Sequence, residues 1–375
     1  MESRGRRKKA LLSILGTIEY ERSMFMCPVC GATRFPGDEL LDVEETSRTP
    51  GMRRMMARAG SKTPFKEAAE DLLIYAGVSV SPKDVERVAE GIGERMEKWV
   101  CQEGEKALAA GPSNADSPPV PILYVLYDGT GVPMVKSEIA GRKGKQPDGS
   151  AKTREAKLGC VFTQTALDSE GRPVRDDDST SFVGAIENAE DFGWRIFKEA
   201  KRRGLDRAER LAVLADGAKW AWNLAKLHFP RAVQIVDIYH AKEHVADLCK
   251  LLFKDEKERT RFRLKWWTDM EDGRIETIVA EAKPRLPRHD AERKAAKKQI
   301  AYLINNKERM RYAAFRFQGL FVGSGVVEAG CRTIIGLRLK QSGMEWSVAG
   351  ANNIIALRCG IQSRLFEDYW ASRTA

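Results

Sequence analysis

Residues 122–131 read ILYVLYDGTG, an apolar run that ends in a carboxylate and a glycine-rich turn. A short apolar run bounded by turn residues is typical of a buried strand. Residues 210–217, RLAVLADG, repeat the order of strand, aspartate and glycine. Side chains that follow the strands of an open α/β sheet face the crevice in which ligands bind. The two segments therefore predict a sheet whose strand ends carry Asp128 and Asp216.

Other segments around these two complete the predicted fold class. Further strands are expected at 158–167, 179–185 and 232–236, and helices at 191–203 and 218–228. Three antiparallel-looking strands followed by alternating helices and strands indicate a mixed five-stranded sheet with helices on its faces. The fold class is therefore α/β.

The chain is expected to consist of six consecutive segments. They are a β-hairpin with a Cys-x-x-Cys knuckle at 1–48, a helical region at 49–110, a linker at 111–121, the first part of the α/β core at 122–244, a basic helical insertion at 245–320, and closing helices at 321–375.

The amino-acid composition limits which binding partners and which cellular compartment we expect for the protein. The 375 residues include 63 Lys and Arg against 53 Asp and Glu, a net charge of +10, which suggests a polyanionic partner. No apolar run approaches the roughly 18 residues of a membrane span, so we expect no membrane partner. Seven cysteines, an odd number and mostly scattered, indicate a reducing compartment. We expect a cytoplasmic protein.

Two short N-terminal patterns each allow two interpretations. Cys27 and Cys30 flank a tight turn that could bind zinc, but a structural zinc site needs four ligands and no second Cys-x-x-Cys exists. The alternative is a pair of reduced thiols. Residues 64–96 form two helical stripes separated by Gly77 and an N-capping Ser81, the outline of a helix-turn-helix. A plain helical hairpin has the same pattern.

Asp128 and Asp216 could share a metal ion if their strands are neighbours. Hard divalent ions such as Mg²⁺ prefer oxygen ligands and support phosphodiester chemistry. An Asp-Gly pair can also simply mark a turn after a strand. A third acid would complete the site, and spacing alone leaves Glu328, Glu345 and Asp237 as candidates.

At these segments the sequence resembles bacterial insertion-sequence transposases of the DDE type, in the ISKra group related to Mutator-like transposases. The resemblance is carried by LYDGTGVP at 126–133, LADGAKW at 214–220, VDIYHAKEH at 236–244, and residues 323–346 with VEAGCR and LKQSGM. It extends from about residue 15 to residue 364.

The resemblance implies a ribonuclease-H-like core in which Asp128, Asp216 and Glu328 bind two Mg²⁺ or Mn²⁺ ions. Asp237 and His240 match the Asp/Cys-x-x-His motif of Mutator-like enzymes, and the resemblance implies a supporting role for both residues. The implied activity is hydrolysis of a phosphodiester at the element end, followed by strand transfer. A nuclease of the same fold without strand transfer, and a protein that only binds DNA, are the alternatives.

The implied partners are the terminal inverted repeats of the element and target DNA, with a homo-oligomer assembled on the DNA at the nucleoid. Candidate DNA contacts are basic or aromatic side chains in three regions. They are Lys83 and Arg87 in the helical region, Trp266 and Trp267 in the insertion, and Arg332, Arg338 and Lys340 in the closing helices.

Two departures from the family pattern qualify these expectations. Members of the family are expected to carry more N-terminal sequence with another Cys-x-x-Cys, so we expect half a zinc site here and either a truncated copy or a misassigned start codon. Glu345 stands where a basic residue is expected, which weakens the case for DNA contact at that turn.

Overall fold

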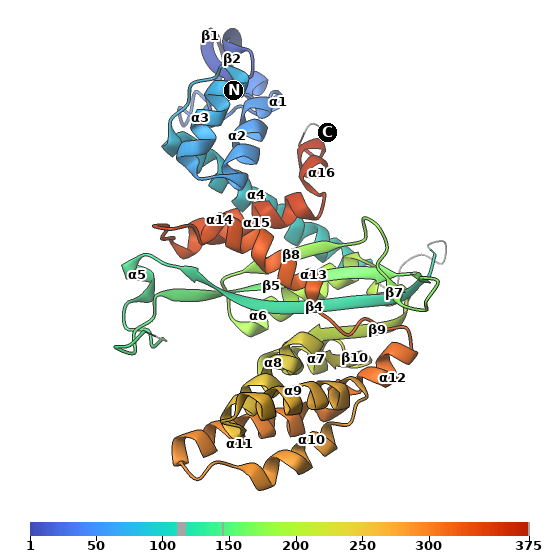
Figure 1. The fold of residues 1–375 in the computed structure, drawn as a ribbon. Coiled ribbons are helices and arrows are strands. Elements are labelled where there is room, and N and C mark those ends of the chain that lie inside the picture. Colours follow the sequence, from blue (N-terminus) through green and yellow to red (C-terminus); the bar gives the residue numbers. More distant parts are fainter. Residues whose placement is uncertain (111–117, 145, 374–375) are drawn as a thin grey trace. The chain divides into compact units, whose positions relative to one another are not determined.

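The computed structural model describes residues 1–110, 118–144 and 146–373 (Figure 1). The chain divides into two compact units, which are described separately. Met1–Gln102, Gly131–Arg154 and Thr333–Ala375 form one, here called the terminal unit. Glu103–Thr130 and Glu155–Arg332 form the other, called the sheet unit.

The sheet unit is built around five strands. They are β4 (Val120–Pro133), β5 (Thr153–Gln164), β8 (Ser181–Ala185), β9 (Ala208–Ala215) and β10 (Val233–Val236). Their order is β10-β9-β4-β5-β8 (Figure 1). β4 and β10 both run parallel to β9, whereas β8 is antiparallel to β5. The predicted mixed five-stranded sheet is therefore confirmed.

The predicted strand at 158–167 differs from the observed structure at both ends. β5 begins earlier, at Thr153, and stops at Gln164. The remaining residues belong to a separate small hairpin of β6 (Ala166–Leu167) and β7 (Pro173–Val174). Asp176 accounts for the break, because its carboxylate accepts from the Thr165 backbone N–H at 2.9 Å and from the Thr165 hydroxyl at 2.7 Å.

Helices α6 (Ala189–Arg202) and α7 (Lys219–His228) pack with the sheet. Leu123 to Leu126 of β4 are completely buried, and each large apolar side chain among them contributes about 1.5–3 kcal/mol by burial. α6 approaches β5 at Gly159, where an added Cβ would lie 2.5 Å from Ile196 Cδ1. A larger residue at position 159 would therefore require the Ile196 side chain to move.

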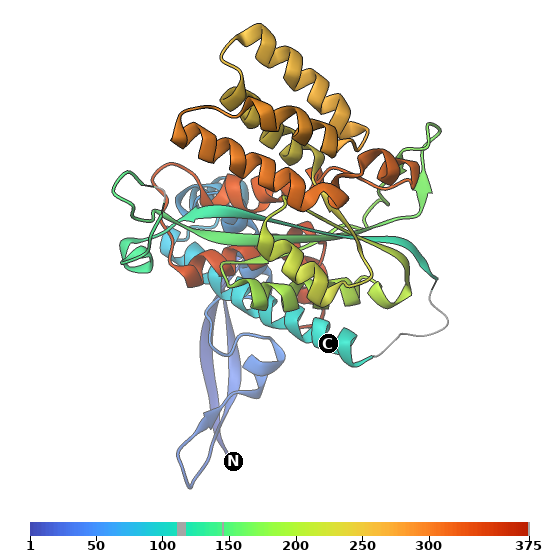
Figure 2. The same ribbon diagram turned by 90° about the horizontal axis from the view of Figure 1, so that it is seen from below.

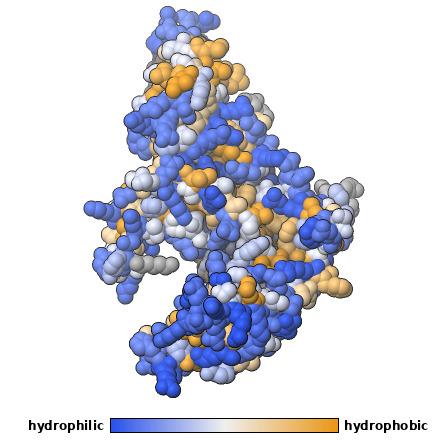
Figure 3. Space-filling view, viewed as in Figure 1, coloured by the Kyte–Doolittle hydropathy of each residue, from blue (hydrophilic) through white to orange (hydrophobic). Residues whose placement is uncertain are grey.

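The helical insertion follows β10 within the same unit. Its helices are α8 (Ile238–Leu252), α9 (Glu256–Glu271), α10 (Ile275–Ala282), α11 (Asp290–Asn306) and α12 (Tyr312–Phe317). Phe262 stacks on Phe253 with ring centroids 4.3 Å apart, and Trp266 is fully buried beside them. In Figure 3 this part of the chain presents a mainly hydrophilic face.

The terminal unit begins with a long hairpin. β1 (Glu2–Ser13) pairs with β2 (Gly16–Met26), and β3 (Thr33–Arg34) and α1 (Pro36–Leu40) follow (Figure 2). Asp38 of α1 is 1% exposed and accepts hydrogen bonds from Lys9, Tyr20 and Arg22 of the hairpin. This buried carboxylate ties α1 to both strands.

Three helices continue the terminal unit: α2 (Pro50–Lys62), α3 (Phe65–Ala76) and α4 (Pro82–Ala109). The expected break and cap between the last two are confirmed. Gly77 ends α3 with a left-handed φ of 65°, and Ser81 Oγ accepts from the Asp84 backbone N–H at 3.1 Å. Most of the predicted linker, residues 111–117, lies outside the described residues, and Val120 already belongs to β4.

The closing helices contribute to both units. α13 (Gly325–Gly330) belongs to the sheet unit, whereas the C-terminal part of the π-helix Cys331–Gly336, α14 (Leu337–Leu339), α15 (Val348–Gln362) and α16 (Phe366–Ala371) belong to the terminal unit, together with the short α5 (Lys136–Ile139). α15 lies directly against α4, since an added Cβ at Gly93 would be 2.0 Å from the Asn353 carbonyl oxygen. Within the described ranges, no helix combines the length and the apolar character needed to cross a bilayer.

Candidate active site

Three neighbouring parallel strands of the sheet unit carry an aspartate in the same row. Asp216 and Asp237 directly follow β9 and β10, whereas Asp128 lies within β4, which continues past the expected strand end to Pro133. Leu126 of β4 lies opposite Leu214 of β9, and Val236 of β10 lies opposite Ala215. Extending these registers places Asp128 opposite Asp216, and Asp216 opposite Asp237. Neighbouring strands are about 4.8 Å apart. The three aspartates therefore lie in one row across these strands.

Asp128 is partly withdrawn from solvent. Its carboxylate accepts from the Gly129 backbone N–H at 2.7 Å and hydrogen-bonds the Cys331 side chain. Burial raises the pKa of Asp128, and the charge of Asp216 raises it further, although the two hydrogen bonds and His240 act in the opposite direction. The site therefore holds two like charges close together.

The turn that carries Asp216 is fixed by the insertion. Asp216 Oδ1 accepts from the Ala218 backbone N–H at 2.8 Å, and Tyr302 of α11 donates its hydroxyl to the Asp216 carbonyl oxygen at 2.8 Å. Gly217 has a φ of 96°, and an added Cβ would lie 2.6 Å from the Tyr302 ring. Only glycine fits between this turn and α11 without a shift.

Tyr302 is itself held by a second contact. Its ring stacks on His244 of α8 with centroids 3.6 Å apart, and His244 Nδ1 lies 2.5 Å from Gln299 Oε1 of α11. Sequence reasoning did not identify Tyr302, because 86 residues separate it from Asp216 and no local pattern marks it.

Asp237 differs from the other two aspartates because both of its oxygens already have partners. It is 3% exposed, and it caps α8 by accepting from the His240 backbone N–H at 2.7 Å. Its second oxygen accepts from the Ser324 backbone N–H. Asp237 therefore joins the start of α8 to the segment that leads into α13.

His240 lies close enough to Asp128 for its charge to lower the pKa of that carboxyl. Its side chain is 47% exposed, with Nδ1 3.7 Å from Glu243. The Asp-x-x-His spacing thus has a structural explanation, since the capping bond joins the Asp237 side chain to the His240 backbone.

Glu328 lies in the first turn of α13 and is exposed. Cys331, three residues later, hydrogen-bonds Asp128. Residues three apart on a helix are neighbours, about 5–6 Å between Cβ atoms. Glu328 is therefore one helical turn from a residue that contacts Asp128. Across the described chain, no three acidic, His or Cys side chains are arranged to hold a metal ion. The role of Glu328 as third carboxylate stays a prediction.

The carboxylates nevertheless suit a hard cation. The charged neighbours that shift the pKa of Asp128 are Asp216 and His240, and no Lys or Arg of the described residues is among them. Two adjacent carboxylates provide oxygen ligands of the kind that Mg²⁺ and Mn²⁺ prefer. The donor set therefore fits such an ion.

Two of the predicted DNA contacts are wrong because their side chains are buried. Trp266 is 0% exposed and donates its indole N–H to Glu281 at 2.9 Å. Arg338 is also 0% exposed, donates to the Gly60 carbonyl oxygen at 3.0 Å, and lies over the ring of Phe65 at 4.5 Å. Both side chains have internal structural roles.

The other predicted DNA contacts are at least partly accessible. Trp267 is half-buried and donates to the Lys242 carbonyl oxygen at 3.1 Å. Four basic side chains are exposed, namely Lys83, Arg87, Arg332 and Lys340. DNA contact by these residues stays a prediction.

The Cys-x-x-Cys turn adopts the shape of a knuckle. The Cys27 backbone N–H donates to the Ala32 carbonyl oxygen at 2.8 Å, and Gly31 donates to the Cys27 carbonyl oxygen at 2.9 Å. Backbone hydrogen bonds from Cys30 and Val29 lower the pKa of the Cys27 thiol. Among the residues that the structure places, no third ligand joins Cys27 and Cys30, and zinc binding there stays a prediction.

These features define a class: a mixed α/β protein with an acidic site at the carboxyl edge of three parallel strands. No family model and no curated protein sequence matches the chain. A solved structure, the Drosophila P element transposase strand transfer complex, matches over 89% of this chain and 83% of that chain, with 8% identity and a TM-score of 0.29. A match at that TM-score establishes neither a shared fold nor a shared function.

Proposed function

We propose that the protein is a metal-dependent DNA-processing enzyme with a ribonuclease-H-like core, acting as an insertion-sequence transposase. The observation that carries this proposal is the strand register that places Asp128 opposite Asp216 at the carboxyl edge of the sheet. The net charge of +10 and the resemblance of the strand-end segments to DDE transposases support it.

Asp128 and Asp216 would hold Mg²⁺ or Mn²⁺, with Glu328 as the third carboxylate. Such ions, when bound, activate a water or hydroxyl nucleophile and stabilise the leaving oxygen of a phosphodiester. The chain's own residues orient the ligands: the Gly129 N–H and Cys331 hold the Asp128 carboxylate, and the Ala218 N–H holds that of Asp216.

Asp237 and Tyr302 are positioning residues in this proposal. Asp237 anchors the segment before α13, and thereby the helix that carries Glu328. Tyr302 fixes the backbone of the Asp216 turn. DNA at the element ends and at the target would be the substrates, bound by an oligomer of the chain.

The test uses the full chain with a supercoiled plasmid and a fragment carrying the DNA that flanks the gene. We expect Mg²⁺-dependent nicking at the element end and joining of the released 3′ end to the plasmid. Asp128→Asn and Asp216→Asn should abolish both, whereas Asp177→Asn, an exposed residue of the same unit, should abolish neither. Nicking without joining would identify a nuclease. A wild-type protein that binds this DNA but does not cleave it with any divalent ion would contradict the proposal.

A further inference from the structure

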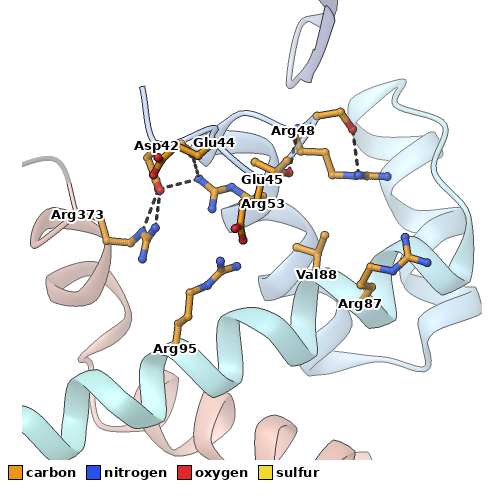
Figure 4. Close-up of a pocket in the computed structure, with 11 residues that line it drawn as sticks. Asp42, Glu44, Glu45, Arg48, Arg53, Arg87, Val88, Arg95 and Arg373 are labelled. Carbon is orange, nitrogen blue, oxygen red and sulfur yellow. Dashed lines mark hydrogen bonds and ion pairs between the residues drawn. The ribbon is translucent and has the colours of Figure 1, made fainter. Parts of the chain in front are cut away.

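A second charged site lies in the terminal unit, in a hollow of about 430 Å³ (Figure 4). It is formed by the loop before α2, by α2 and α4, and by the residues after α16. The charged lining consists of Asp42, Glu44, Glu45, Arg48, Arg53, Arg87, Arg95 and Arg373. Ligand sites commonly have volumes of about 300–1,000 Å³, so the hollow can accommodate a small anionic group.

Most of these guanidinium groups are held by carboxylates. Arg53 lies 2.7 Å from one oxygen of Asp42, and Arg373 donates to the same carboxylate at 2.9 Å. Asp84 pairs with Arg48 at 2.8 Å and with Arg87 at 3.4 Å. These four arginines are therefore fixed in place by the protein.

Two guanidinium groups that line the hollow keep an unsatisfied donor. Arg53 is 3% exposed, yet its Nε has no hydrogen-bond partner, and neither has the buried Nε of Arg48. Arg95 extends from α4 into the hollow and forms no ion pair within the described part of the chain (Figure 4). Burial lowers the pKa of Arg53, and repulsion by Arg95 and Arg373 contributes to this shift.

We propose that this hollow binds a phosphate group, with Arg95 as its accessible anchor and Arg48 and Arg53 as its fixed base. The planar guanidinium fork matches phosphate oxygens in pairs. A dianionic or monoanionic phosphate would also relieve the repulsion among Arg53, Arg95 and Arg373. A nucleic-acid backbone and a free phosphate ion present the same oxygens, so either can supply this group. The site contains none of the carboxylates of the sheet unit and does not depend on their function.

Glu45 allows the charge of the ligand to be tested, because its exposed carboxylate lines the same hollow. A bound phosphate would be repelled by this charge. Removing the charge should strengthen binding, whereas removing Arg95 should weaken it.

The experiment measures equilibrium binding of the full chain without divalent ions, to inorganic phosphate and to a 20-base-pair DNA in separate titrations. Arg95→Ala should weaken binding of the phosphate-bearing ligand by roughly tenfold. Glu45→Gln should strengthen this binding. Lys98→Ala is the matched control, since Lys98 is an exposed cation one turn further along α4 and does not line the hollow. Circular dichroism checks that each variant is folded.

The two titrations separate the sources of the phosphate. If Arg95→Ala weakens DNA binding and reduces the slope of log affinity against log salt concentration by about one, the site holds a backbone phosphate. If only inorganic phosphate binding changes, the site holds a free ion. If Arg95→Ala matches Lys98→Ala with both ligands, the proposal is wrong. None of these outcomes depends on DNA cleavage, so the failure of either proposal can be recognised separately.

Discussion

The carboxyl edge of the sheet gathers acidic side chains, whereas the arginine hollow is lined by five arginines and three carboxylates, so the two sites balance charge differently. In the hollow, Asp42 and Asp84 each pair with two of the arginines. At the sheet edge, the charged residues that shift the pKa of Asp128 are Asp216 and His240. In each cluster the groups already bonded by the protein have a structural role, and the remaining ones are available to a ligand.

The same distinction holds within the aspartate row. Asp237 lies in register with Asp128 and Asp216, but its two oxygens are used by backbone N–H groups. A row of three acids therefore need not be a row of three ligands. The predictions below test which acids are structural and which bind metal.

The largest effect is expected at the third carboxylate. Glu328→Gln keeps the size of the side chain but removes the charge that would hold the metal ion. It should abolish Mg²⁺-dependent cleavage, a loss of on the order of a thousandfold if several kcal/mol of transition-state stabilisation disappear. DNA binding, measured by mobility shift, should stay near the wild-type value.

Glu345→Gln is the matched control for this change and should retain activity. If Glu328→Gln cleaves at the wild-type rate while Asp237→Asn does not, Asp237 is the third ligand, and the division between structural and metal-binding acids is wrong.

Asp237→Ala should cause the largest loss of stability. It leaves the His240 and Ser324 backbone N–H groups without their acceptor, and hydrogen bonds to a charged group are worth about 1.5–3 kcal/mol each. Urea unfolding should therefore show a decrease of several kcal/mol, on the order of 3 or more. Asp177→Ala, at an exposed turn, should change the unfolding free energy by less than about 0.5 kcal/mol. Equal unfolding free energies for the two variants would show that Asp237 has no structural role.

Tyr302→Phe tests the connection between the insertion and the sheet edge. The variant loses the hydrogen bond to the Asp216 carbonyl oxygen, worth about 1 kcal/mol, while the ring still stacks on His244. We expect a higher Mg²⁺ concentration for half-maximal cleavage. Tyr239→Phe, at a 62% exposed tyrosine of α8, is the control. A loss of stability without any change in the Mg²⁺ dependence would show that Tyr302 only supports the fold.

The smallest effect concerns pH. The folded-state pKa of Asp128 is raised by burial and by Asp216, so the folded protein binds more protons than the unfolded chain between the ordinary carboxyl pKa and the raised value. Stability should fall as pH rises through this window and remain lower above it.

Asp128→Asn removes this cost, so it should raise the free energy of unfolding at pH 7 relative to pH 4, measured without divalent ions. Added Mg²⁺ should stabilise the wild type more than the variant. If the variant shows the same pH dependence as the wild type, the pKa of Asp128 is not raised in the folded protein.

Much of the local structure could be predicted because its causes are local. The apolar run before Asp128 forms β4, and the run before Asp216 forms β9. Gly77 and Ser81 end and begin helices as their backbone and side-chain chemistry requires. The ends of strands are harder to predict from local sequence. β5 is an example, because the Asp176 carboxylate that bonds Thr165 just after this strand comes from a separate loop.

Side-chain burial was the main source of error. Trp266 and Arg338 have the chemistry of DNA contacts, yet both are completely buried. Their environment depends on neighbours distant in the sequence: Gly60 is 278 residues from Arg338. No local pattern distinguishes a buried arginine from an exposed one.

The sequence by itself determined the strands, the aspartates that follow them and the basic character of the chain, because these depend on residue type and short-range spacing. Only the tertiary structure decided that β4 and β10 flank β9, which places three aspartates in one row, and that Asp237 uses its oxygens for backbone groups. It also decided that Tyr302 reaches Asp216 and that five arginines gather in one hollow. Strand order and long-range contacts arise from packing among distant segments, and the short-range spacing of residues does not predict them.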